Sequence, residues 1–173
     1  MIEPNHFGIP PWNSFELWSQ AVRSLEHLRA KRWPNLQQAK QLAGRIEKKL
    51  RAVNGDLETL CSETCESCID ICCKKATVWY DFKDLLYICF SSGFLPAGQI
   101  YKNPDFSCSN LAPSGCQLPR TMRPFICTWY ICPDQVAIFS GKRLQDRRRM
   151  MVAIQEIQGL RKQLENEFIV AVR

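Results

Sequence analysis

Ten cysteines gathered mainly in two short stretches limit what this chain can fold into more than any other feature. The first stretch runs from Cys61 to Cys73 and the second from Cys108 to Cys132. Either disulfides or metal ligation can explain such a load, and the redox compartment decides between them. Residues 1–11 carry neither a basic start nor an apolar run of signal-peptide length, and no later run reaches the ~20 apolar residues of a membrane span. We therefore expect a cytoplasmic protein, without a membrane segment, whose reduced cysteines bind metal.

The first four cysteines of the first stretch share one face of a helix if that stretch is helical. They lie at offsets of 0, 4, 7 and 11 residues, within a stripe about 60° wide at 100° per residue. Eleven residues of helix cover about 16 Å, however, and zinc–sulfur bonds are only ~2.3 Å long. Two arrangements remain open. Either the helix breaks and the segment wraps one metal, or neighbouring cysteines serve two sites that the second stretch completes.

Nine of the ten cysteines are candidate metal ligands: Cys61, Cys65, Cys68, Cys72, Cys73, Cys108, Cys116, Cys127 and Cys132. Adjacent cysteines seldom chelate one tetrahedral metal, so Cys72 and Cys73 should diverge. The tenth, Cys89, lies among apolar residues, and we expect a buried thiol without a metal. The two histidines, His6 and His27, lie outside the clusters. An all-cysteine ligand set mildly favours an iron–sulfur cluster, of the 4Fe-4S type, over the alternative of zinc.

The formal net charge of +6 counts every cysteine as a neutral thiol. A metal-bound cysteine is a thiolate. Eight thiolates remove eight units of charge, and two divalent metals or two cubane cores of charge +2 restore four, which leaves about +2. We therefore do not expect nucleic acid as a partner, and the run Arg147 to Arg149 fits a solvated helix start.

Apolar periodicity predicts a mainly α fold in one domain over residues 1–173. A helical hairpin is expected over residues 13–55, with a first helix from Asn13 or Ser14 to Trp33 and a second from Asn35 to Asn54-Gly55. Asp81 should cap a further helix that closes near Gly93. A long C-terminal helix should cover residues 144–172.

Between these helices lies the cysteine core, residues 61–133. The part from Phe94 to Pro133 is rich in Pro, Gly, Asn and Ser and shows little periodicity. A stretch of this length without regular structure needs another source of order. Metal ligation would supply that order, because the free energy of binding a structural metal is also free energy of folding.

The order of these motifs resembles the CxxCxxCC cysteine-cluster proteins, described as the YkgJ-like zinc- or iron-chelating family. The resemblance covers roughly residues 61–132 and depends on the pair Cys72-Cys73, on Gly115-Cys116 followed by Leu118-Pro119, and on Arg123-Pro124-Phe-Ile-Cys127. The spacing departs from the family pattern at residues 69–71, where three residues rather than two precede the cysteine pair. Cys61 is an addition to the pattern.

The resemblance implies metal or iron–sulfur binding, and one branch of the family is similar to flagellin lysine methylases. It also points to Arg123 as a cofactor-binding residue, since a guanidinium near a thiolate-ligated centre offsets negative charge. Three functions follow as hypotheses. They are an iron–sulfur protein for electron transfer or metal handling, a zinc-stabilised module that binds a partner protein through exposed Trp12, Trp18 and Trp33, and a cluster-dependent enzyme related to those methylases.

Overall fold

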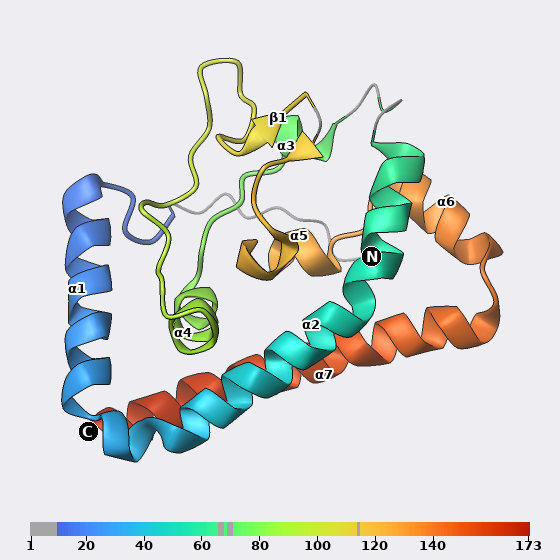
Figure 1. Cartoon of the computed structure of the whole chain (residues 1–173). Helices are drawn as coiled ribbons and strands as arrows, with labels where there is room; N and C mark the ends of the chain where they lie inside the picture. The colour runs from blue at the N-terminus through green and yellow to red at the C-terminus, as the bar shows by residue number, and fades with distance from the viewer. Residues whose placement is uncertain (1–9, 66–67, 69–70, 114) are drawn as a thin grey trace.

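Two long helices, α2 (Gln37–Thr64) and α7 (Leu144–Val172), run alongside each other and form the base of the molecule (Figure 1). The computed structural model describes residues 10–65, 68, 71–113 and 115–173. The protein is mainly α-helical, as the periodicity predicts, and α7 has the bounds expected for the long C-terminal helix. None of the helices within these described ranges is long and apolar enough to cross a membrane.

The N-terminal helix pair consists of α1 (Phe15–Lys31) and α2, joined by the 3-10 turn η1 (Trp33–Leu36). Ser14 caps α1, because its side-chain oxygen accepts a hydrogen bond from the N–H of Leu17 at 3.2 Å. The two helices diverge from η1 in Figure 1, and α2 packs mainly against α7 and α4.

The predicted end of the second helix at Asn54-Gly55 is wrong, because α2 continues to Thr64. Val53, Leu57 and Leu60 are all buried and extend the apolar stripe past the glycine. Burying large apolar side chains contributes about 1.5–3 kcal/mol each, which exceeds the roughly 1 kcal/mol that a helical glycine costs. Tertiary packing therefore overrides the local stop signal.

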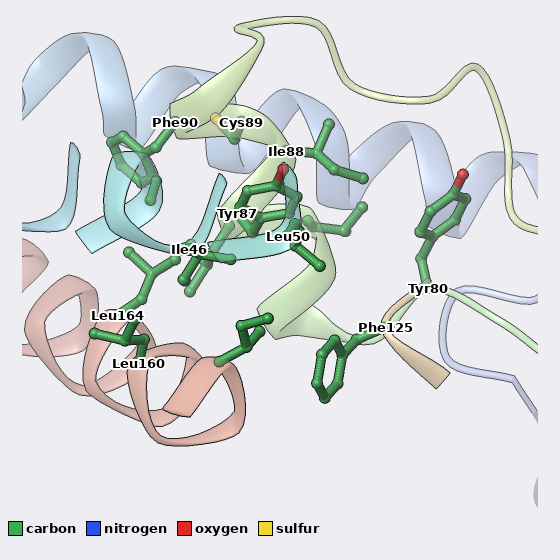
Figure 2. Close-up of a cluster of buried hydrophobic side chains, with 14 of the residues drawn as sticks. Ile46, Leu50, Tyr80, Tyr87, Ile88, Cys89, Phe90, Phe125, Leu160 and Leu164 are labelled. Atoms are coloured by element: carbon green, nitrogen blue, oxygen red, sulfur yellow. The ribbon is translucent and has the colours of Figure 1, made fainter. Parts of the chain in front are cut away.

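The core lies where α2 and α7 meet α4 (Phe82–Ser91). Ile46 of α2 lies together with Leu160 and Leu164 of α7 in Figure 2, and all three are at most 5% exposed. The capping box that begins α4 forms as expected, with the Asp81 carboxylate accepting from the N–H of Asp84 at 2.7 Å.

The cysteine core lies above this base in Figure 1 and is built from short elements. These are α3 (Cys72–Lys75), the strands β1 (Leu111–Ala112) and β2 (Gly115–Cys116), the 3-10 turn η2 (Arg120–Met122), α5 (Ile126–Trp129) and α6 (Pro133–Gly141). The strands are antiparallel, with Leu111 opposite Cys116. The loop-rich character expected for residues 94–133 is thus confirmed.

One expected docking residue is not available at the surface. Trp18, expected among the exposed aromatic anchors, is only 3% exposed and belongs to the core. Its ring packs against Tyr80 at a centroid distance of 5.9 Å, and its Nε1 donates to the carbonyl of Pro96 at 3.1 Å. The prediction of an exposed Trp18 is therefore wrong, because that side of α1 is covered by the loop after α4.

Candidate metal centre

The first cysteine stretch is not one continuous helix. Cys61 lies in the last turn of α2, Cys65 is its C-cap, and Cys72 begins α3. The helix therefore breaks between the cysteines, which removes the obstacle that a straight helix of about 16 Å would pose to shared ligation. Cys68 lies between the two helices, where its N–H donates to the carbonyl of Cys65 at 3.4 Å.

Three thiols form a first group, which comprises Cys61, Cys65 and Cys72. Burial raises the pKa of Cys65 to about 11, a hydrogen bond from Thr64 opposes that rise, and negative charge at Cys61 and Cys72 adds to it. Cys65 and Cys61 also share a hydrogen bond. The three sulfur atoms are therefore close enough for the charge on one to disfavour ionisation of another.

Four thiols from three separate segments form a second group, which comprises Cys73, Cys108, Cys116 and Cys127. The N–H of Cys108 donates to the carbonyl of Cys73 at 2.8 Å, which ties the start of α3 to the loop before β1. Cys116 lies on β2 and pairs with Leu111, which follows Cys108 by three residues. Backbone pairing thus brings together cysteines that are more than 30 residues apart in the chain.

Charge interactions relate Cys127 to this second group. Burial is the main cause that raises the pKa of Cys127 to about 12, and negative charge at Cys116 and Cys108 raises it further. The nearby Arg123 guanidinium lowers it. A group of four thiolates would repel one another strongly here, and a bound cation would remove that repulsion.

Adjacent Cys72 and Cys73 join the two groups. The pKa of Cys73 is raised by a hydrogen bond with Cys72, then by burial, and then by negative charge at Cys72, Cys108 and Cys127. Cys72 has charge interactions with the first group and Cys73 with the second. The two side chains also interact with each other, so the expectation that Cys72 and Cys73 diverge to different sites stays a prediction.

Two buried polar residues that the sequence did not single out converge on Cys61. Arg120 Nη2 donates to Cys61 Sγ at 3.3 Å, and Gln135 Nε2 donates to the same sulfur at 3.5 Å. Arg120 is 6% exposed, and its Nε has no hydrogen-bond partner among the described residues. Because a buried guanidinium is costly without a counter-charge, this arginine fits a thiolate better than a neutral thiol.

Arg123, the arginine that the sequence did single out, lies beside the second group. Its Nε donates to the carbonyl of Leu118 at 2.9 Å and its Nη2 to the carbonyl of Cys116 at 3.4 Å. Arg123 therefore holds the strand that carries Cys116, and its charge acts on Cys127. Both contacts fit a residue that lies next to a metal centre and positions its ligands without binding the metal itself.

Cys132 lies at the edge of the first group. It is the N-cap of α6, its N–H donates to Gln135 Oε1 at 3.3 Å, and Gln135 bonds Cys61 through its other amide atom. Pro133 occupies the first turn of α6, where proline suits a helix start, so the helix accounts for the Cys132-Pro133 dipeptide.

The remaining cysteine and the histidines stand apart from both groups. Cys89 is 1% exposed within α4, where burial raises the pKa of its thiol, and Figure 2 shows it in the hydrophobic core. His27 lies in α1, away from the cysteine core. His6 lies outside the described residues.

The donor set suits a soft, thiophilic metal, although the side chains are not at ligand spacing. Within the described part of the chain no disulfide joins any of the cysteines, and no three Cys, His, Asp or Glu side chains there lie close enough together to hold an ion. Four thiols, of which that of Cys108 is buried and those of Cys73, Cys116 and Cys127 are half-buried, together with a neighbouring guanidinium fit zinc or an iron–sulfur cluster in chemistry.

Comparison of the chain with protein-family models, with curated proteins and with solved structures finds no match. The resemblance to the YkgJ-like cysteine-cluster proteins therefore stays a prediction based on the motifs between residues 61 and 132.

Proposed function

We propose that this chain is a cysteine-ligated metal-binding protein, that an iron–sulfur cluster is its favoured cofactor, and that zinc is the alternative. The observation that carries the proposal is the second thiol group, Cys73, Cys108, Cys116 and Cys127. Four cysteines from three segments converge there, with a backbone hydrogen bond of 2.8 Å between Cys108 and Cys73. Such convergence of thiols in a loop-rich region is typical of sites where the metal supplies the order.

Burial raises the pKa of Cys65 and Cys127, so these thiols are protonated without a metal, and the arginines beside both groups would stabilise the thiolates that metal binding produces. Four thiolates around a divalent metal or a 4Fe-4S core of charge +2 carry a net charge of about −2. Arg123 lies beside the second group, and Arg120 reaches the sulfur of Cys61 in the first. Guanidinium groups at both places would offset that negative charge and donate hydrogen bonds to sulfur.

Two centres side by side explain the arrangement better than one. The second group has four thiols, which is a complete set for zinc or a cluster. The first has three, and Cys68 and Cys132 are the candidates for its fourth ligand. We therefore propose that Cys72 serves the first centre and Cys73 the second.

Anaerobic purification followed by metal and sulfide analysis tests the proposal. Iron with acid-labile sulfide and a brown colour support a cluster, whereas a colourless protein with stoichiometric zinc selects the alternative. A preparation that contains neither, and that takes up neither on reconstitution, contradicts metal binding altogether.

A pair of cysteine variants tests the ligands. Cys127→Ser should lose the second centre, and Cys89→Ser, the matched control outside both groups, should keep the metal content of the wild type. If two centres are present, Cys127→Ser should retain about half of the metal. Full metal content in Cys127→Ser would refute its assignment as a ligand.

A further inference from the structure

The structure contains a cavity of about 530 Å³ that the proposed metal centres do not use. It lies between the chain leading into α1 and two segments, residues 76–78 and residues 98–102. Figure 1 shows two of the segments that line it, the blue chain that leads into α1 and the yellow-green segment that follows α4. Its volume falls within the range of pockets that bind small organic molecules.

The walls of the cavity are held in place by one glutamine side chain. Gln99 Nε2 donates to the carbonyls of Pro11 and Tyr80 at 3.0 and 3.1 Å, and its Oε1 accepts from the N–H groups of Tyr80 and Ile100 at 2.7 and 3.0 Å. This single residue therefore joins three segments that are distant in sequence. A cavity with such fixed walls is largely formed before any ligand arrives, which lowers the entropic cost of binding.

Four aromatic residues are among those that line the cavity. Trp12 and Trp18 meet edge to face, with centroids 6.3 Å apart and ring planes at 74°. Phe15 and Tyr101 also line the cavity, and they are 74% and 67% exposed. Trp12 is held at a φ of +52°, a conformation that is uncommon outside glycine and that concentrates at ligand clamps.

One charged residue lies among these rings. Lys102 lines the cavity, and its Nζ donates to the carbonyl of Lys74 at 2.7 Å. No carboxylate forms an ion pair with Lys102 in the part of the chain that the structure describes. Its positive charge is thus available to an anionic group at the cavity.

We propose that this cavity binds a planar aromatic carboxylate, with the ring system packed against Trp12 and Trp18 and the carboxylate directed to Lys102. Aromatic rings favour stacked or edge-to-face partners over aliphatic ones of equal area. The ammonium group selects an anion over a neutral analogue. The site goes beyond the proposed metal function, because none of these three residues belongs to either thiol group.

The cavity also borders the second thiol group, because Cys108 forms part of its wall. A bound molecule would therefore lie against a proposed metal ligand. Binding itself depends on the rings and Lys102, so it can be measured whether or not metal is present. Failure of the metal proposal and failure of the cavity proposal are thus separate outcomes.

Isothermal titration of the purified full chain with 2-naphthoate tests the site. The wild type should bind one molecule per chain, and both 2-naphthalenemethanol and decanoate should bind at least about fivefold more weakly, because the first lacks the charge and the second the rings. Lys102→Gln should lose most of the preference for 2-naphthoate over 2-naphthalenemethanol. Absence of saturable binding to the wild type, or equal affinity for all three molecules, would overturn the proposal.

A matched pair of glycine substitutions locates the binding. Gly98 lines the cavity, and a Cβ built on it would meet no atom within 4 Å, so Gly98→Trp should place a bulky ring at the cavity without a clash at the backbone. Gly159 on α7 has the same free space far from the cavity, and Gly159→Trp is the control. Gly98→Trp should weaken 2-naphthoate binding at least tenfold and Gly159→Trp should not. Equal affinity in the two variants, with both showing wild-type circular dichroism, would place any binding elsewhere and refute the site.

Discussion

A buried ion pair, Arg161 with Asp84, connects the helical base to the cysteine core. Arg161 Nη1 lies 2.6 Å from Asp84 Oδ1, and both side chains are only 5% exposed. The same Oδ1 accepts a hydrogen bond from the N–H of Phe125 at 3.0 Å, and the Phe125 ring lies 4.7 Å from the Arg161 guanidinium. Because Phe125 precedes Cys127 by two residues, the pair holds the segment that carries this proposed ligand.

Replacing Arg161 with methionine should destabilise the protein in a pH-dependent way. Burial raises the pKa of Asp84 to about 6, although the charge of Arg161 lowers it, so removing Arg161 raises the pKa further. An acid whose pKa is raised on folding loses stability as the pH rises through the interval between its unfolded and folded values. Near pH 5 the Asp84 carboxyl is mostly protonated in the wild type and in the variant alike. At pH 8 the variant must either bury an unpaired Asp84 carboxylate or keep that carboxyl protonated, and both cost stability.

The expected size follows from these values. Breaking a buried pair by removing one partner costs about 3–5 kcal/mol, which is the loss expected at pH 8. Since pH 8 lies about two units above the wild-type pKa, up to about 3 kcal/mol of that loss should be absent at pH 5. Arg161 also pairs with Asp81, whose Oδ1 lies 2.9 Å from Arg161 Nη2 and whose side chain is more exposed than that of Asp84.

Urea unfolding followed by circular dichroism at pH 5 and pH 8 measures the effect. Each variant is compared with the wild type at the same pH, so that protonation of the thiols affects both equally. Lys162→Met, on the exposed face of α7, is the control and should change stability by less than about 0.5 kcal/mol. The double variant Asp84→Asn with Arg161→Met should recover part of the loss. A loss for Arg161→Met that is equal at both pH values would refute this reasoning.

Three further predictions concern the core and the thiols. Leu164→Ala, at a fully buried site, should lower the free energy of unfolding by about 2–5 kcal/mol. The control Val170→Ala, at a site that is 70% exposed, should lower it by under about 0.5 kcal/mol. Urea unfolding measures both, and similar losses in the two variants would argue against the packing described. Cys89 should resist iodoacetamide in the folded protein at pH 8, because it is buried and its pKa is raised, and rapid labelling detected by mass spectrometry would contradict this. Arg120→Met removes the hydrogen bond to Cys61 Sγ and should weaken metal binding about tenfold, as measured by competition with a chelator. Unchanged metal affinity would show that the guanidinium does not act on a metal-bound thiolate.

The helices were predictable from the sequence because their stabilising contacts repeat locally. The long C-terminal helix follows from apolar residues at helical spacing, and the capping box of Asp81 and Asp84 marks the start of α4 within four residues. The end of α2 was not predictable in this way. Asn54-Gly55 is a local stop signal, and only the neighbours of Leu57 and Leu60 in space make the longer helix more stable.

The candidate site, like the fold, has residues that the sequence could identify and residues that only the structure revealed. The cysteines and Arg123 could be named from residue type and motif order, since few residue types ligate soft metals. Arg120, Gln135 and Asp84 gave no such signal, because an isolated arginine, glutamine or aspartate in a sequence is most often at the surface. Their roles come from burial and from partners more than 30 residues away.

By itself, the sequence of this protein determined a mainly α chain with ten cysteines in and around a loop-rich segment, because composition and periodicity depend only on neighbours along the chain. The tertiary structure alone decided which cysteine-bearing segments lie together, since the backbone hydrogen bond between Cys108 and Cys73 depends on where the chain returns. It also decided that Trp18 is buried beside a cavity rather than displayed at the surface. Contacts between distant segments depend on how the helices pack, and no local pattern encodes that packing.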